Sequence, residues 1–462
     1  MDDERVSHQL SQVDLHAGGE STLDDPDAAT PISKIPYDVL LDIFHAVAEP
    51  GTFEVGRGAL LAITHVCMDW RKVALDFPSL WSSFMVNIRE TTSHLRLLEL
   101  YLQRSRDAPL SVRIHARYRE QHLDVAGSRA VLALLAQHSN RFFSLQLTGF
   151  WDGVEWFGIR GKLPHLEILQ LPDSRIHETH QFDDVPRLHT LRTRGRCITL
   201  SGFPPARPWK RIPCAQIRFL VIWPQTMRDI PSHGLQLDDF PKLTSLRCIL
   251  PCRDTNDDGA ILSMWGTRSA PFLLPRLTSW CIEVDGPENT LRVPELGEML
   301  DHFTTPALQS LDIIYLVHPT NLYSFLKRSN CGLTHLVLRR SSIRVGELLE
   351  ILELLPALER LLIDNGFTPT MVTNKFFDNL VLSPGRRVLV PGLRELSIRG
   401  TYIFQGPKLL EMLQSRVGSN LKFVQLALPT RLVEGLDLLG MKALVGVCVL
   451  VARADKGAYI DL

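Results

Sequence analysis

Apolar residues recur along most of the chain in one short pattern: an apolar residue, two others, an apolar residue, one other, and an apolar residue. Eleven copies lie between residues 142 and 426, and successive copies begin 22 to 35 residues apart. Clear examples are Leu166-Leu169-Leu171, Leu333-Leu336-Leu338 and Leu393-Leu396-Ile398. Because side chains alternate between the faces of a strand, each copy predicts a short strand with one apolar face.

Helix-like segments separate several of these strands, among them "RVGELLEILELL" at 344–355 and "GPKLLEMLQSR" at 406–416. Leu-x-x-Leu-x-Leu at this period is typical of leucine-rich repeats, in which stacked neighbours bury the apolar face that one repeat cannot bury alone. The pattern predicts an α/β fold, an irregular solenoid with a curved parallel sheet and helices on its convex side. An ordinary doubly wound α/β domain is the alternative, since it also alternates strand and helix.

The stretch "IPYDVLLDIF" at 35–44 is more apolar than a surface helix requires. On a helical wheel the apolar residues of this helix cover an arc of roughly 220°, leaving a strip of Asp38, Asp42 and His45. An amphipathic helix needs only about 100° to face its own core. Either the helix is buried on several sides by its own chain, or one side faces a second protein.

Two further short helices are predicted at 59–67 and 68–77, after a Gly-rich and Pro-containing spacer at 49–58. Three short helices form a module near the lower size limit for independent stability. A large exposed apolar surface would be a liability in so small a unit unless a partner covered it.

These residues resemble the F-box, whose usual pattern is Leu-Pro-x-Glu-Leu-Leu-x-x-Ile-Phe, then Val-Cys-x-x-Trp-Arg, then Leu-Trp. Ile35 and Asp38 replace the usual Leu and Glu, and the spacer is somewhat long. The resemblance implies docking on the Skp-type adaptor of a cullin-RING ubiquitin ligase, and some of the matching residues serve only as core. The candidate adaptor-binding residues are Ile35, Pro36, Val39, Leu40, Ile43, Phe44, Val66, Cys67 and Trp70.

The predicted organisation has four parts. Residues 1–30 form an acidic tail with too few large apolar groups to order it, and 31–84 form the F-box-like module. Residues 85–139 form connecting helices and a strand, and 140–462 form the solenoid with a terminal capping segment. The absence of a Gly/Ser-rich linker predicts continuous packing from the module into the solenoid.

Composition and charge narrow the function. A net charge of −1 does not favour nucleic acid or an anionic membrane as partner. No apolar run reaches the length of about 20 residues that spans a bilayer. The start of the chain lacks the features of a signal peptide, and the eight cysteines are scattered, which suits a reducing cytoplasm or nucleus.

No catalytic signature was found, and no cofactor is expected. "HETH" at 177–180 has its histidines three residues apart rather than four, and Cys248 and Cys252 have no second pair, so no metal site is predicted.

Residues that alternate with the buried leucines are expected to line the concave side of the solenoid. Basic residues outnumber acidic ones among those nominated, which suggested an acidic or phosphorylated degron, although a wall of mixed charge remained the alternative. The candidate substrate-binding residues are Arg192, Trp223, Arg247, Arg339, Arg360 and Arg399.

Together these features predict a non-enzymatic substrate receptor, similar to the fungal F-box proteins with leucine-rich repeats. The adaptor would link it to the cullin and RING subunits, and the solenoid would hold a client protein. A scaffold that binds the adaptor without joining a ligase is the alternative, and a solenoid that carries a small ligand is a third possibility.

Overall fold

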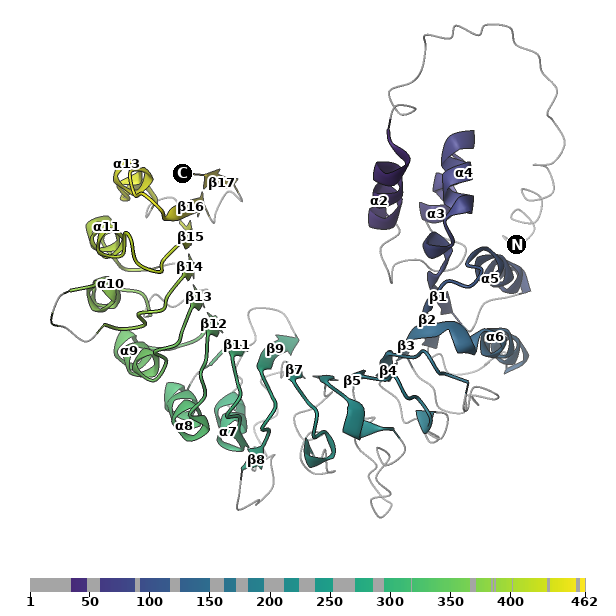
Figure 1. The fold of residues 1–462 in the computed structure, drawn as a ribbon, viewed down its shortest axis with the longest axis horizontal. Helices are drawn as coiled ribbons and strands as arrows, with labels where there is room; N and C mark the ends of the chain where they lie inside the picture. The colour runs from purple at the N-terminus through teal and green to yellow at the C-terminus, as the bar shows by residue number, and fades with distance from the viewer. Residues whose placement is uncertain are drawn as a thin grey trace, which may run out of the picture.

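A computed structural model shows an arc of strands with helices along its outer side (Figure 1). It describes residues 35–47, 59–87, 92–116, 125–149, 162–171, 182–194, 212–223, 237–251, 271–285, 295–316, 318–365, 371–383, 385, 388–400, 402–429, 433–453 and 458–461. The predicted tail at 1–30, the spacer at 49–58, the "HETH" stretch and Cys252 lie outside these residues.

Fourteen parallel strands form one continuous sheet in which each strand pairs with the next one along the arc. This order excludes a doubly wound domain, where the strand order reverses, and confirms the α/β solenoid prediction. The strands are β1 (Ser83–Asn87), β2 (Leu110–Ala116), β3 (Phe142–Gly149), β4 (Ile168–Leu171), β5 (Thr190–Arg194), β6 (Phe219–Trp223), β7 (Ser245–Pro251), β9 (Ser279–Asp285), β11 (Ser310–Ile314), β12 (His335–Arg339), β13 (Arg360–Asp364), β14 (Glu395–Arg399), β15 (Phe423–Leu428) and β16 (Cys448–Arg453).

Strand β17 (Ala458–Asp461) pairs antiparallel with β16 at the end of the sheet. Two short strands, β8 (Phe272–Leu273) and β10 (Phe303–Thr304), form a separate parallel pair. Strand β16 overlaps the apolar run "ALVGVCVLVA" at 443–452.

Helices cover the convex side of the arc in both of its arms (Figure 1). They are α5 (Thr92–Arg104), α6 (Val125–Gln137), α7 (Glu295–Asp301), α8 (Pro319–Ser329), α9 (Val345–Glu353), α10 (Asn374–Leu380), α11 (Gly406–Ser415) and α13 (Leu438–Lys442). Between β3 and β7 the described connections contain short 3-10 turns instead, at Cys214–Gln216 and Leu237–Asp239.

The register of the sheet aligns the repeated leucines into two buried rows. In one row Leu311, Leu336 and Leu361 are direct partners on successive strands, and in the other row Ile313, Leu338 and Ile363 are partners. All six are at most 1% exposed. A strand whose apolar face is covered by the helices therefore needs apolar residues only at alternate positions.

The sheet begins earlier than the predicted solenoid start at residue 140. Strands β1 and β2 already belong to it, and α5 and α6 are the helices of two further repeats. In the β1 repeat the apolar positions are Trp81, Phe84 and Val86, so aromatic side chains stand where leucine is usual.

The module at the N-terminal end consists of α2 (Tyr37–Val47), α3 (Ala59–Ile63) and α4 (Met68–Asp76). Trp81, which is fully buried, joins this module to the solenoid. Its indole N–H donates to the carbonyl of Ala74 in α4 at 2.6 Å, and its ring packs edge-on against Tyr101 of α5 at 5.1 Å between ring centroids. The expected continuous packing between the two parts is present at this joint.

Candidate protein-interaction surfaces

Helix α2 has one side in the module core and one side exposed. Leu40 and Phe44 point inward, with exposed fractions of 4% and 0%, and the Phe44 ring meets Trp70 of α4 edge-on at 5.1 Å. These two predicted adaptor-binding residues are therefore covered by their own chain. In this arrangement they support the helix and do not offer a surface to a partner.

The exposed side of α2 carries a stripe of apolar residues. Val39, Ile43 and Val47 follow one another at spacings of four residues, which places them on one face of the helix. They are 40% to 45% exposed, and Tyr37 at the start of the helix is 58% exposed. We call Val39, Ile43 and Val47 the α2 stripe.

The junction between α3 and α4 adds two exposed apolar side chains, Val66 and Met68, with exposed fractions of 54% and 81%. Cys67 between them is also exposed, whereas Ile35 and Trp70 are partly buried against the core. Of the nine predicted adaptor-binding residues, five are thus accessible: Pro36, Val39, Ile43, Val66 and Cys67. Met68 was missed, because it stands at a position of the motif that specifies no residue type.

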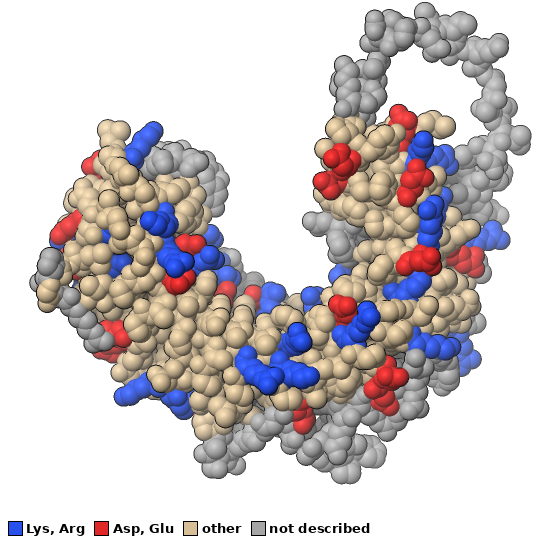
Figure 2. All heavy atoms as spheres, viewed as in Figure 1, with Lys and Arg blue, Asp and Glu red and all other residues tan. Residues whose placement is uncertain are grey.

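The concave wall of the solenoid consists of the strand residues that alternate with the buried rows; in β12 they are His335, Val337 and Arg339. Their side chains alternate with the buried rows and face the inside of the arc. All six predicted substrate-binding residues belong to strands of this wall. Figure 2 shows Lys and Arg side chains gathered near the middle of the arc, with some Asp and Glu side chains among them.

Three of the predicted arginines are paired with carboxylates of neighbouring strands. Arg247 binds Glu283 at 2.6 Å, Arg339 binds Asp312 at 2.9 Å, and Arg360 binds Glu395 at 3.2 Å. Glu283 and Asp312 were not among the residues nominated from the sequence. Aligning adjacent repeats at their leucines would have placed them beside the arginines. These three ion pairs balance the charge of half of the six candidate residues. The wall therefore carries less unbalanced positive charge than the sequence predicts.

Burial and charge act together on these pairs. Burial raises the pKa of Asp312 above its ordinary value, and the guanidinium of Arg339 offsets part of that rise. The hydrogen bond from Arg247 to Glu283 is the largest cause that raises the pKa of the arginine. Arg399 donates to the side-chain carbonyl of Gln425 at 3.0 Å.

Arg192 differs from the other five because its side chain is exposed and makes no ion pair with a described carboxylate. It lies beside strand β6, whose wall positions are Phe219, Val221 and Trp223. Phe219 is 44% exposed, and the other two are half-buried. Of these three residues, Trp223 is one of the candidate substrate-binding residues predicted from the sequence.

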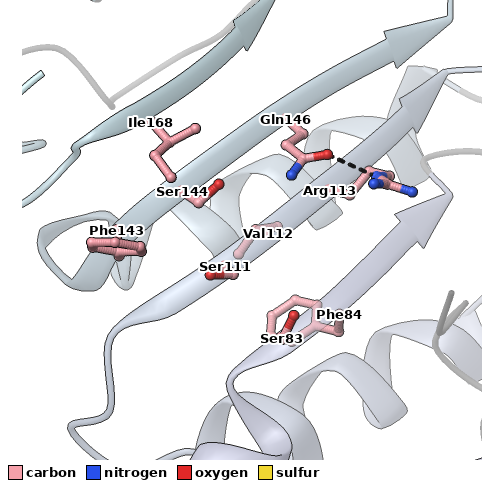
Figure 3. Close-up of a pocket in the computed structure, with 9 residues that line it drawn as sticks. All are labelled: Ser83, Phe84, Ser111, Val112, Arg113, Phe143, Ser144, Gln146 and Ile168. Carbon is pink, nitrogen blue, oxygen red and sulfur yellow. Dashed lines mark hydrogen bonds between the residues drawn. The ribbon is translucent and has the colours of Figure 1, made fainter. Parts of the chain in front are cut away.

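A shallow hollow of about 190 Å³ lies on the wall at β1 to β4 (Figure 3). Ser83, Ser111 and Ser144 are aligned on adjacent strands there, and their short side chains leave the space open. On the same face, Arg113 donates to the side-chain oxygen of Gln146 at 3.0 Å. Desolvation, and secondarily the positive charge of Arg192, lowers the pKa of Arg113.

A scan against models of known protein families finds no match to the chain, and a search of curated proteins finds no match either. Neither comparison names an F-box.

Within the described ranges, no helix has both the length and the apolar character needed to cross a bilayer. The described side chains also include no group of three or more His, Cys, Asp or Glu placed to hold a metal ion.

Proposed function

We propose that the chain is a substrate receptor of a cullin-RING ubiquitin ligase. The helical module would dock on a Skp-type adaptor, and the concave wall would hold a client protein. Catalysis would belong to the partners, and the contribution of this chain would be to bring the client close to them.

The observation that carries the proposal is the exposed apolar surface of a very small module. The α2 stripe, Val66 and Met68 lie on a unit of three short helices, alongside a core that already contains Leu40 and Phe44. Exposed apolar area of this kind is typical of a surface that another protein covers. The F-box resemblance is the reason for proposing a Skp-type adaptor as that protein.

The solenoid supports the second half of the proposal. A curved parallel sheet gives an extended concave surface of the kind that repeat proteins use for binding. Trp81 and Tyr101 pack the module onto the first repeats, so that an adaptor held at one end and a client held on the wall would keep a defined separation.

Replacing Val39 and Ile43 together by Asp tests the docking. Both side chains are at least 40% exposed, so the variant should fold normally and lose capture of a purified Skp-type adaptor. The matched control is Ala46→Asp, on the same helix and also exposed but outside the α2 stripe, which should retain capture. Undiminished capture by the folded double variant would refute the adaptor assignment.

Recovery of the cullin distinguishes a ligase subunit from an adaptor-bound scaffold. Affinity purification of the intact chain should bring down the adaptor together with the cullin and RING subunits. Recovery of the adaptor without a cullin would favour the scaffold.

A further inference from the structure

Strand β6 is unusual on the concave wall because all three of its wall positions carry large apolar side chains. Phe219, Val221 and Trp223 face the inside of the arc, while Leu220 and Ile222 fill the buried rows. In no other described strand of the sheet are all three wall positions occupied by large apolar residues. Phe219 is 44% exposed and Val221 and Trp223 are half-buried, so the wall face of β6 presents apolar surface as well as its buried face.

Val221, the middle wall residue of β6, has an arginine beside it on each neighbouring strand. In the sheet register Arg192 of β5 is the partner of Val221, and Val221 is in turn the partner of Arg247 of β7. Neighbouring strands are about 4.8 Å apart, so the backbones of Arg192 and Arg247 flank the apolar strand, and both side chains start from the wall face beside it.

The two arginines differ in their charge balance. Arg247 is held by Glu283 through contacts of 2.6 Å and 3.2 Å from its two nitrogens. Arg192 has no carboxylate partner among the described residues, and its side chain is exposed. The available positive charge is therefore on the β5 side of the apolar strand.

We infer that β6 and Arg192 form the client-binding centre of the wall, and that they take an extended peptide segment with an apolar side chain next to a carboxylate. The apolar side chain would lie on Phe219, Val221 and Trp223, and the carboxylate would pair with Arg192. The short separation between strands requires the two groups to lie within two residues of one another in an extended segment. Trp and Arg are also the residue types enriched where binding energy concentrates in protein interfaces.

This inference rests on the proposed function only in assuming that the solenoid holds a client. It narrows the candidate client-binding surface from the six predicted residues to β6 and Arg192, because Arg339 and Arg360 already have acidic partners. A client carboxylate at either of those positions would have to displace Asp312 or Glu395.

The test is selection from a random peptide library displayed on phage, with the intact chain immobilised. The wild-type chain should enrich peptides in which Asp or Glu lies within two residues of an aromatic or large aliphatic residue. Arg192→Glu should change the enriched charge from acidic to basic while the apolar residue is kept. A merely structural role of Arg192 would not reverse that charge.

A synthetic peptide of the enriched sequence gives the magnitude. Trp223→Ala and Phe219→Ser should each weaken its binding about tenfold or more, as expected for central interface residues. Arg360→Glu is the matched control, because Arg360 is on the same wall but distant along the sheet and paired with Glu395. It should leave binding unchanged. Thermal melting of each variant identifies any that fail to fold, in which case Arg192→Glu alone carries the test.

Several outcomes would overturn the inference: no common motif in the selected peptides, the same acidic motif selected by wild type and Arg192→Glu, or loss of binding in Arg360→Glu alone. Self-association of the chain that Trp223→Ala abolishes would also overturn it, in favour of a second copy as the occupant. Adaptor capture is measured separately. Failure to capture the adaptor with the peptide motif intact would refute the ligase role and leave the client surface standing.

Discussion

The helical module and the solenoid differ in where their apolar side chains lie. In the solenoid, buried rows such as Leu311, Leu336 and Leu361 run the length of the sheet, and the opposite face of most strands is polar or charged. In the module, α2 has apolar residues on both sides, and those of the α2 stripe remain exposed. Each repeat is covered by its neighbours, whereas the described part of the module meets the solenoid at its Trp81 end.

This difference shows which surfaces are candidates for partners. A repeat array satisfies its strands internally, so an apolar residue on its wall is an exception that calls for an explanation. Strand β6 is that exception in the solenoid, and the α2 stripe is its counterpart in the module. The following predictions test how strictly the division between core and partner surface holds, from the largest effect to the smallest.

The largest effect should come from truncating a buried side chain of α2. Phe44→Ala removes a fully buried ring packed against Trp70 and should cost about 3–5 kcal/mol of local stability. Ile43→Ala, one residue earlier and 40% exposed, should cost under about 1 kcal/mol. Amide hydrogen exchange in α2 measures both. Equal effects would mean that the two sides of the helix are not distinct.

A buried arginine provides the corresponding test in the solenoid. Arg416 follows α11, is fully buried, and donates to the backbone carbonyls of Leu380, Leu389 and Val390 at 2.8 Å, 3.0 Å and 3.3 Å. Burial lowers its pKa to about 10, which leaves it charged at neutral pH. Arg416→Met would leave these carbonyls unsatisfied, and we expect a loss of about 2–4 kcal/mol in thermal or denaturant unfolding.

The control for this change is Arg360→Met on the wall. Its ion pair with Glu395 is about half exposed on the arginine side, and such pairs contribute about 0–1 kcal/mol. A loss as large as that of Arg416→Met would show that the wall ion pairs support the fold rather than merely occupy its surface.

The Asp312 carboxyl should give a smaller effect that depends on pH. Because burial raises its folded pKa above the unfolded value, the folded state binds the proton more tightly. Its contribution to stability is therefore present at low pH and is lost as pH rises through the folded pKa. Relative to Asp312→Asn, the wild-type chain should gain stability as pH falls through the acidic range, in unfolding curves at a series of pH values. A constant difference between the two proteins would contradict the raised pKa.

The smallest effect is expected at the hollow near β1 to β4. Ser111→Leu places a larger side chain where the wall is open and should change stability by less than about 0.5 kcal/mol. A loss of about 1–3 kcal/mol would mean that the leucine is forced against packed side chains and that the hollow is not open. The thermal midpoint of the variant separates the two results.

The sequence alone determined the repeated strand, its buried positions and the helices that return between strands. The spacing of Leu333, Leu336 and Leu338 is sufficient for this because the alternation of side chains in a strand is a local property. The three helices of the module were likewise predictable from apolar spacing. The β1 repeat was missed since Trp81 and Phe84 replace the expected leucines.

Only the tertiary structure decided which of these residues remain available to a partner. Val39 and Leu40 are adjacent in the chain and both apolar, yet one is 45% exposed and the other 4%, because the packing of α3 and α4 covers one side of α2. Arg339 and Arg192 both lie on the wall, yet among the described residues only Arg339 of the two forms an ion pair, with Asp312 of the neighbouring strand. Exposure and ion pairing depend on residues distant in the chain. The strand register that brings those residues together is a property of neighbouring repeats and not of one repeat alone.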